Sequence, residues 1–351
     1  MTDPVCDLVL LTWDHLEETQ PCVESLVRHT DVPSRLLIVD NGSVSPAKEF
    51  VASVKPSGAI VEVRVLRNPS NEGYPRGMNR GLRESTAPYV CLLNNDLLVA
   101  PGWLSELIAV AASHPRIGIV NPSSETLGQH PGRGQTLDGY AAELQRLRGQ
   151  WIEMGACVGF CMLIKREVTE QIGLLGEQFG MGYFEDTDYC LRARHAGYTC
   201  VRAKAAFVHH KENRSFKDTW RTQRDQDAQF DRSAQVFYAT WGKPERRAYV
   251  VVADGTVGRL REDMLQQANR DGVVVMFAPR QLPSLTVPEH TNITYKPIAG
   301  RGFALRVLWT MVKKKKKFDR IIINHRGLGR VFRQLRWLHR ACVDVQDPSP
   351  H

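Results

Sequence analysis

Asn94, Asn95 and Asp96 form a polar turn directly after an apolar run, and they are the first candidates for chemistry in this chain. At positions i and i+2, the side chains of Asn94 and Asp96 point the same way, so an amide and a carboxylate can share one hard cation. Oxygen ligands of this type suit Mg²⁺ or Mn²⁺ bound to a diphosphate. Taken alone, the three residues also describe an ordinary Asn/Asp turn after a strand.

Three further carboxylates lie within four residues, at Glu185, Asp186 and Asp188, where a helix over residues 185–195 is predicted to begin. One or two acidic residues in a first helical turn are ordinary capping chemistry, but three exceed that need. Clustered carboxylates repel, and the repulsion can raise the pKa of one of them towards the value that a general base requires. The cluster is therefore a candidate for acid–base work.

His209 and His210 follow the apolar run of residues 205–208, again at the end of a predicted strand. A buried histidine is more often a hydrogen-bonded core residue than a ligand. A cation held by Asp96 and one of these histidines would keep positions for phosphate oxygens and water. The spacing does not decide which of the two histidines would bind.

The candidate polar residues are carried by a chain in which predicted strands and helices alternate. The predicted buried strands cover residues 7–12, 35–40, 61–66, 89–93 and 117–120, and the predicted helices between them cover residues 17–29, 46–54, 76–84 and 101–113. Such alternation predicts the α/β class, with a mainly parallel sheet covered on both faces. Ligands of open parallel sheets bind at the carboxyl ends of the strands, so the polar turns at Thr12, Asp40, Asn71 and Asn94 should crowd one edge.

The segment from Asn71 to Arg80, which includes Gly73 and Asn79, offers acceptors and exposed backbone where a base and ribose could lie. Its glycines are spaced four apart, which does not fit the dinucleotide-binding fingerprint, and no P-loop is present. Residues 122–149 read as a long loop with a short helix, which is typical of functional lids or linkers. A further strand is predicted over residues 155–164.

A second α/β pattern begins after residues 241–244, and we place a domain boundary there, giving domains 1–243 and 244–351. In this second, Rossmann-like unit, strands are predicted over residues 248–253, 273–277 and 320–324, and helices over residues 257–269 and 303–312. Residues 245–351 carry 20 Lys/Arg against 9 Asp/Glu, so the net charge of +8 belongs to this basic unit. Such a unit could meet nucleic acid, an anionic membrane or an acidic acceptor.

The composition is that of a globular protein, with 42% hydrophobic and 24% charged residues. No apolar run is long enough to span a bilayer, and the first residues do not resemble a secretory signal. We therefore expect a cytoplasmic location. Peripheral attachment to the inner face of the membrane is compatible with it. The eight cysteines form no paired CxxC arrangement, and we interpret them as reduced core residues.

Six motifs in one order resemble the inverting glycosyltransferases of family 2, which have the GT-A fold and include rhamnosyltransferase-like members. The match is collinear over about residues 7–216. The motifs are a Val-Asp-Asn-Gly-Ser turn (Val39 to Ser43), an Asn-x-Gly segment with two further glycines (Asn71 to Gly81), a Leu-Asn-Asn-Asp motif (Leu93 to Asp96), a Gly-Ala-Cys strand ending in a basic residue (Gly155 to Arg166), a Phe-Glu-Asp-x-Asp helix (Phe184 to Asp188), and a histidine followed by a serine (His210 and Ser215).

The resemblance implies roles for single residues. Asp40 would bind the nucleotide base, with Thr12 and Asn71 in the same pocket and with Gly73, Asn79, Asn94 and Asn95 assigned to donor binding. Asp96 would bind the metal, completed by His210, with His209 as the alternative. Asp186 would be the general base, while Glu185 and Asp188 would position the helix or the acceptor. Asn94 stands where many relatives have Asp, so the metal would be held by one fewer charge.

The predicted function is metal-dependent, inverting transfer of a sugar from a nucleoside-diphosphate donor to a hydroxyl acceptor, in polysaccharide or glycoconjugate assembly. The cofactor would be Mg²⁺ or Mn²⁺, and a UDP- or dTDP-sugar is expected ahead of a GDP-sugar. The acceptor would be a carbohydrate, a lipid-linked sugar or a protein, with peripheral contact to an anionic membrane as a further partner and no nucleic acid.

Two alternatives stand beside this prediction. A sugar nucleotidyltransferase shares a related core and metal, but it needs a Gly-rich, Arg/Lys-containing loop after the first strand, where this chain has Thr12-Trp13-Asp14-His15. A nucleic-acid or anionic-surface binding module would suit the basic C-terminal unit, but it leaves the carboxylate motifs without a function. The amphipathic segments around residues 313–317 and 328–342 fit either a membrane contact or a solvated helix face.

Overall fold

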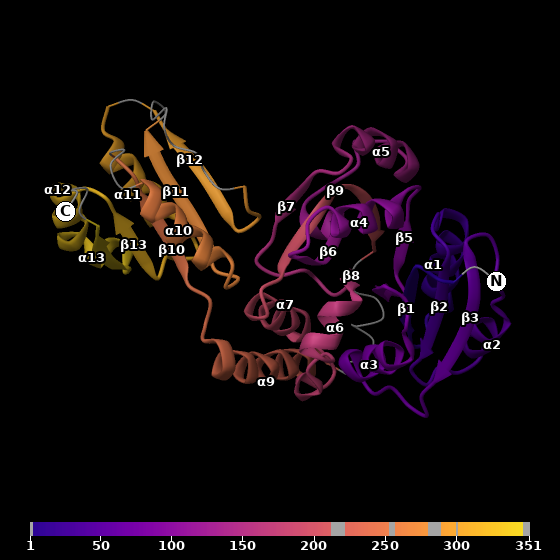
Figure 1. Ribbon diagram of the computed structural model, residues 1–351. Helices are drawn as coiled ribbons and strands as arrows, with labels where there is room; N and C mark the ends of the chain where they lie inside the picture. The colour runs from indigo at the N-terminus through magenta and orange to yellow at the C-terminus, as the bar shows by residue number, and fades with distance from the viewer. Residues whose placement is uncertain (1–2, 212–221, 253–256, 280–288, 300, 347–351) are drawn as a thin grey trace. The chain divides into compact units, whose positions relative to one another are not determined.

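The computed structural model describes residues 3–211, 222–252, 257–279, 289–299 and 301–346 (Figure 1). The chain divides into two compact units. One comprises Met1–Ile152 and Ala156–Gly242, and the other comprises Glu153–Gly155 and Lys243–His351.

A mainly parallel sheet forms the centre of the first unit. Its strands follow the order β3-β2-β1-β4-β8-β6-β9-β5, and β7 pairs with β9. Pairing is parallel throughout β3-β2-β1-β4 and between β6 and β9, whereas β8 and β5 run antiparallel to their neighbours. The strands are β1 (Cys6–Thr12), β2 (Ser34–Asp40), β3 (Ile60–Arg67), β4 (Tyr89–Asn94), β5 (Leu97–Val99), β6 (Ile117–Ser123), β7 (Trp151–Glu153), β8 (Cys161–Lys165) and β9 (Thr199–His210).

Helices cover both faces of this sheet (Figure 1). The helices of this unit are α1 (Leu16–His29), α2 (Ala47–Ser53), α3 (Tyr74–Glu84), α4 (Trp103–Ala112), α5 (Leu137–Leu144), α6 (Arg166–Ile172), α7 (Glu185–His195) and α9 (Gln223–Trp241), with short 3₁₀ turns η1 (Glu125–Leu127), η2 (Gln145–Leu147) and η3 (Glu177–Phe179). Alternation along β1 explains the two layers, because successive strand residues face opposite sides. Leu8 and Leu10 pack in a core cluster with α1 and α4, whereas Val9 and Leu11 face α3.

Close packing of α3 on β1 explains the glycines spaced four apart. A Cβ atom on Gly77 would lie 2.4 Å from the Leu11 side chain, and one on Gly81 would lie 2.2 Å from the Val9 side chain. Only glycine leaves room for the helix at this distance from the strand. The spacing therefore serves helix–sheet packing.

The second unit is a smaller sheet in which all neighbouring strands are parallel, in the order β12-β11-β10-β13-β14. The α/β class, the mainly parallel central sheet and the smaller parallel unit after it are thus confirmed. Its elements are β10 (Arg246–Val250), α10 (Val257–Ala268), β11 (Val273–Pro279), β12 (Ile293–Ile298), α11 (Phe303–Lys313), β13 (Arg320–Ile323), α12 (Arg326–Gln334), α13 (Arg336–His339) and β14 (Cys342–Val345).

Three expectations about single elements are wrong. The strand over residues 61–66 is not buried, because β3 is the edge strand of the sheet and leaves Val61 38% and Val65 40% exposed. The strand predicted over residues 155–164 begins only at Cys161, because side chains of other segments bind the backbone of Val158 and Gly159. Cys342 is exposed, while the other seven cysteines are buried.

None of the described helices is both long enough and apolar enough to cross a lipid bilayer.

Candidate active site

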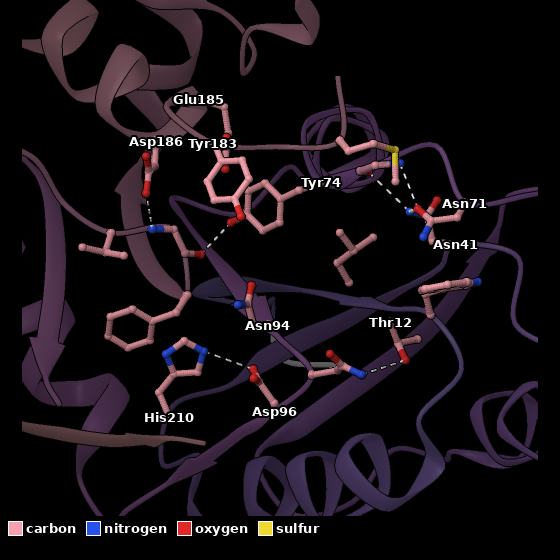
Figure 2. A pocket seen from close by; sticks show the side chains of 18 of the residues that line it. Thr12, Asn41, Asn71, Tyr74, Asn94, Asp96, Tyr183, Glu185, Asp186 and His210 are labelled. Atoms are coloured by element: carbon pink, nitrogen blue, oxygen red, sulfur yellow. Dashed lines mark hydrogen bonds and ion pairs between the residues drawn. The ribbon is translucent and has the colours of Figure 1, made fainter. Parts of the chain in front are cut away.

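A cavity of about 350 Å³ lies at the carboxyl ends of the strands of the first unit. The turns after β1, β2, β3 and β4 all contribute to it, through Thr12, Asn41, Asn71 and Asn94 among others. Figure 2 shows these side chains together with those of Asp96 and His210, and with Glu185 and Asp186 at another side of the same space. The residues that line it are Leu11, Thr12, Trp13, Asn41, Asn71, Gly73, Tyr74, Asn94, Asn95, Asp96, Val158, Gly159, Phe160, Met181, Tyr183, Phe184, Glu185, Asp186 and His210.

Asp96 and His210 meet at one wall of the cavity. Antiparallel pairing of β5 with β9 sets Leu97 opposite His210, and Asp96 directly precedes β5. The Nε2 atom of His210 lies 3.3 Å from Oδ1 of Asp96, and both side chains are nearly buried. The ring of His210 stacks on Phe160 with the ring centroids 4.9 Å apart. The pairing of two short strands thus places a carboxylate against an imidazole.

The hydrogen bonds around this pair fit a cation. Nδ1 of His210 lies 2.9 Å from the Thr126 hydroxyl, and when it donates a proton there, Nε2 carries a lone pair that faces Asp96. Oδ1 of Asp96 is buried and receives no hydrogen bond from any residue that the structure describes. Two acceptor atoms 3.3 Å apart need a proton or a cation between them.

Glu185 and Asp186 lie at the amino terminus of α7 with different surroundings. Both oxygens of Asp186 are bound, because Oδ2 accepts the Gly159 amide at 2.9 Å and Oδ1 accepts the Thr187 amide at 2.6 Å. Burial raises the pKa of Asp186, and these hydrogen bonds oppose the rise. Burial, followed by the nearby charge of Asp186, raises the pKa of Glu185 to about 8. Near neutral pH, Glu185 therefore holds a proton while Asp186 is the carboxyl group more readily ionised.

The turn that precedes α7 has an uncommon backbone conformation. Tyr183 and Phe184 both have positive φ angles, 71° and 70°, which are rarely adopted by residues other than glycine. Strained backbone of this kind is concentrated at functional sites. Phe184 packs against Phe230 and Phe237 of α9, which holds the turn in place. The turn directly precedes Glu185 and Asp186, which both line the cavity.

Asparagine amides build another wall. The Nδ2 atom of Asn41 donates to Oδ1 of Asn71 at 2.8 Å, and the same oxygen accepts the Gly73 amide at 3.0 Å. Gly73 has φ 83°, and a Cβ atom on it would lie 2.6 Å from the carbonyl oxygen of Gly180. The nearby Asn95 amide donates to the Thr19 hydroxyl at 2.9 Å. This wall is cross-linked by hydrogen bonds and presents polar groups to the cavity.

Four of the residues assigned to the site do not line the cavity. The Asp40 carboxylate accepts the Ser43 amide at 2.8 Å and pairs with Arg67. Asn79 is buried and binds both backbone groups of Leu175, which ties α3 to the segment before η3. The side-chain polar atoms of Asp40 and Asn79 are thus already hydrogen-bonded or ion-paired within the chain.

Asp188 and His209 also point elsewhere. Asp188 accepts a hydrogen bond from Nε1 of Trp241 at 2.9 Å and pairs with Arg192, so it joins α7 to α9. His209 lies on the opposite side of β9 from His210, with Nδ1 2.8 Å from the Glu125 carboxylate. The other assigned residues, Thr12, Asn71, Gly73, Asn94, Asn95, Asp96, Glu185, Asp186 and His210, all line the cavity. Ser215 lies outside the described residues.

Several residues that line the cavity have no role assigned to them from the sequence. The Tyr74 hydroxyl donates to the carbonyl oxygen of Gly159 at 2.5 Å, and burial raises its pKa well above the ordinary value. Tyr183 and Phe184 add aromatic surface near the carboxylates. Trp13 and Asn41 follow β1 and β2 directly and belong to the polar turns that were expected at this edge, although neither was given a role.

Parts of this sequence are similar to those of known proteins. Residues 8–173 match the family model described as Glycosyl transferase family 2. An uncharacterized protein of Sinorhizobium fredii, y4gI, is 31% identical over 261 residues, which cover 68% of this chain and 28% of that protein. This chain therefore spans less than a third of that relative's length.

An N-acetylglucosaminyl-diphospho-decaprenol L-rhamnosyltransferase of Mycobacterium tuberculosis is 26% identical over 253 residues, covering 62% of this chain and 80% of the enzyme. Among solved structures, the mannosyltransferase PcManGT of Pyrobaculum calidifontis in complex with GDP-Man and Mn²⁺ is 17% identical, covers 67% of this chain and 65% of its own, and has a TM-score of 0.48. The family match includes the turns after β1, β2, β3 and β4 that line the cavity. Over residues 8–173, just under half of its length, this chain therefore matches glycosyl transferase family 2.

Proposed function

We propose that the chain is a metal-dependent, inverting glycosyltransferase that moves a sugar from a nucleoside-diphosphate donor to a hydroxyl acceptor. One observation carries the proposal. Asp96, His210 and Asp186 come from three segments far apart in the sequence and line the same cavity. Neither rival prediction, the sugar nucleotidyltransferase or the binding module, gives a reason for a carboxyl group with a raised pKa to line the same cavity as a carboxylate–imidazole pair.

Asp96 and His210 would hold the divalent cation, with Asn94 beside them. A cation bound there would neutralise charge on the diphosphate as it leaves. The mixed carboxylate and imidazole set suits Mn²⁺ better than Mg²⁺, because Mg²⁺ prefers oxygen ligands throughout. The wall of Asn41, Asn71, Gly73 and Thr12 would bind the nucleoside.

Asp186 is the proposed general base. It would take the proton of the acceptor hydroxyl while that oxygen bonds to the anomeric carbon from the side opposite the diphosphate. The bond from the anomeric carbon to the phosphate oxygen breaks in the same displacement, so the nucleoside diphosphate leaves and the configuration inverts. Glu185, protonated near neutral pH, adds no second negative charge at this point.

We propose the donor and the acceptor only as classes of molecule. A UDP- or dTDP-sugar stays expected ahead of a GDP-sugar, and the acceptor is a carbohydrate, a lipid-linked sugar or a protein. The name of the mycobacterial relative specifies a sugar linked through diphosphate to decaprenol, which favours the lipid-linked class. A cytoplasmic location, peripheral membrane contact and a role in polysaccharide assembly stay predictions.

The test is the release of nucleoside diphosphate from a panel of sugar donors, measured with and without EDTA. We expect release with Mn²⁺ that EDTA abolishes, and Asp186→Asn should slow sugar transfer by about 10²–10⁴-fold. Glu185→Gln is the matched variant and should retain more activity, since glutamine resembles the protonated acid. Near wild-type transfer by folded Asp186→Asn would refute the assignment, and pyrophosphate formation from a sugar phosphate and a nucleoside triphosphate would favour the nucleotidyltransferase.

A further inference from the structure

Large apolar side chains are exposed on one layer of the second unit. Leu305 is 72% and Trp309 62% exposed on α11, Val331 is 46% exposed on α12, and Trp337 is 73% exposed on α13. Burial of apolar side chains is strongly favourable, so four such residues in one layer indicate a surface that is covered during function. We name these four residues together the apolar surface.

The four residues belong to the same layer of helices. Val307 and Met311 of α11 and Phe332 of α12 pack in one core cluster with strands β10 and β13, whereas α10 packs in another cluster. Helices α11 and α13 also contact each other. In α11, Leu305, Trp309 and Lys313 are spaced four apart and lie along the side opposite the buried residues. The layer is therefore amphipathic, with its apolar surface directed outwards.

Positive charge surrounds the apolar surface. Residues 301–341 contain 13 Lys/Arg and a single acidic residue, Asp319. The Lys313 ammonium group lies 3.4 Å from the centre of the Trp309 ring. Exposed arginines flank Val331 and Trp337, namely Arg330, Arg333, Arg336 and Arg340. The partner of this surface must therefore be both negatively charged and able to accept apolar side chains.

We propose that α11, α12 and α13 form a docking surface for an anionic lipid bilayer. Indole rings favour the boundary between headgroups and acyl chains, and basic side chains around them bind anionic headgroups. A single-stranded nucleic acid would offer bases for Trp309 and Trp337 to stack on, but nothing apolar for Leu305 and Val331. This inference does not depend on the transfer reaction, and its test contains no sugar donor.

The experiment measures sedimentation of the full chain with vesicles of phosphatidylcholine, with and without phosphatidylglycerol. We expect binding only to the anionic vesicles, weakened by salt, with a blue shift of tryptophan emission as the indole rings leave water. Trp309→Ser combined with Trp337→Ser should remove the blue shift and most of the binding. Trp151→Ser is the matched control, because Trp151 is a partly exposed tryptophan of the first unit.

A second pair of variants tests the charges. Lys315→Gln with Lys316→Gln should weaken binding at low salt by about fivefold for each charge. Lys48→Gln with Lys55→Gln removes two exposed charges from the first unit and should change nothing. Absence of binding to anionic vesicles, or binding that is unchanged in the double tryptophan variant, overturns the proposal. Binding to a single-stranded oligonucleotide without binding to vesicles overturns it too.

Discussion

Glu185 and Asp186 are neighbours in the sequence, but their surroundings make Asp186 the more readily ionised of the two. The Asp186 carboxylate accepts hydrogen bonds from two backbone amides, which favour its charged form. Oε2 of Glu185 is buried and receives no hydrogen bond from the residues that the structure describes. Two carboxyl groups whose environments separate their pKa values are typical of sites that move protons.

The raised pKa of Glu185 makes a prediction about stability. In the folded protein the Glu185 carboxyl group has a pKa of about 8, whereas in the unfolded chain its pKa returns to the ordinary value of 4.5. The free energy of unfolding should therefore fall as pH rises from about 4.5 to 8, relative to Glu185→Gln, which cannot lose a proton. Since each pKa unit is worth about 1.4 kcal/mol, the difference should reach roughly 4 kcal/mol at pH 8. Urea unfolding at several pH values measures it, and a constant difference across this range would contradict the assignment.

Asp96 and His210 lead to a prediction about metal binding. Asp96→Asn should weaken Mn²⁺ binding by more than about 100-fold, since loss of an outer-shell partner alone costs 10–100-fold. His210→Gln should also weaken it, whereas His209→Gln should not, because His209 faces Glu125. Calorimetric titration with Mn²⁺ measures these affinities. Equal losses for the two histidine variants would show that the metal is not held by His210.

At the scale of elements, α3 is placed by two glycines and α7 by contacts with α9. Gly81 lets α3 lie close to β1, and the amino end of α3 carries Gly73 and Tyr74 into the cavity wall. Asp188, Trp241 and Phe184 hold α7 against α9, so the direction of Asp186 depends on a helix that begins 37 positions later. The site is thus assembled by packing between elements.

Gly81→Ala tests the packing of α3. Alanine favours a helix over glycine by about 1 kcal/mol, but its Cβ would meet Cγ1 of Val9 at 2.2 Å, and overpacking of a core costs about 1–3 kcal/mol. Because Val9 is branched at Cβ and cannot move aside easily, we expect net destabilisation of about 1–2 kcal/mol. The second substitution Val9→Ala should relieve it, so that the two changes are non-additive in denaturant unfolding. Stabilisation by Gly81→Ala alone would show that α3 can shift.

At the scale of the whole molecule, the chain divides into two compact units, and the cavity lies in the first. Nucleoside diphosphate with Mn²⁺ should therefore stabilise the first unit only. At a ligand concentration of about 100 times Kd the gain is about 2.7 kcal/mol. Scanning calorimetry should show one transition that moves to higher temperature and one that does not. Asp96→Asn should abolish the shift, and a shift of both transitions would contradict independent units.

The sequence by itself determined the α/β class, most elements of the first unit and the turns that bear polar residues. These features depend on local patterns: short apolar runs, helical periodicity and polar residues after strands. It did not indicate α9, whose polar sequence packs through a few aromatic residues, nor the exposed edge position of β3.

Only the tertiary structure decided which polar residues meet. His210 and His209 are equivalent in the sequence, but the alternation of β9 turns one towards Asp96 and the other towards Glu125. Asp186 and Asp188 look alike in the motif, yet the helix carries one into the cavity and the other to Trp241. Side-chain direction depends on strand pairing and helix packing between distant segments. A local stretch of sequence does not determine those contacts.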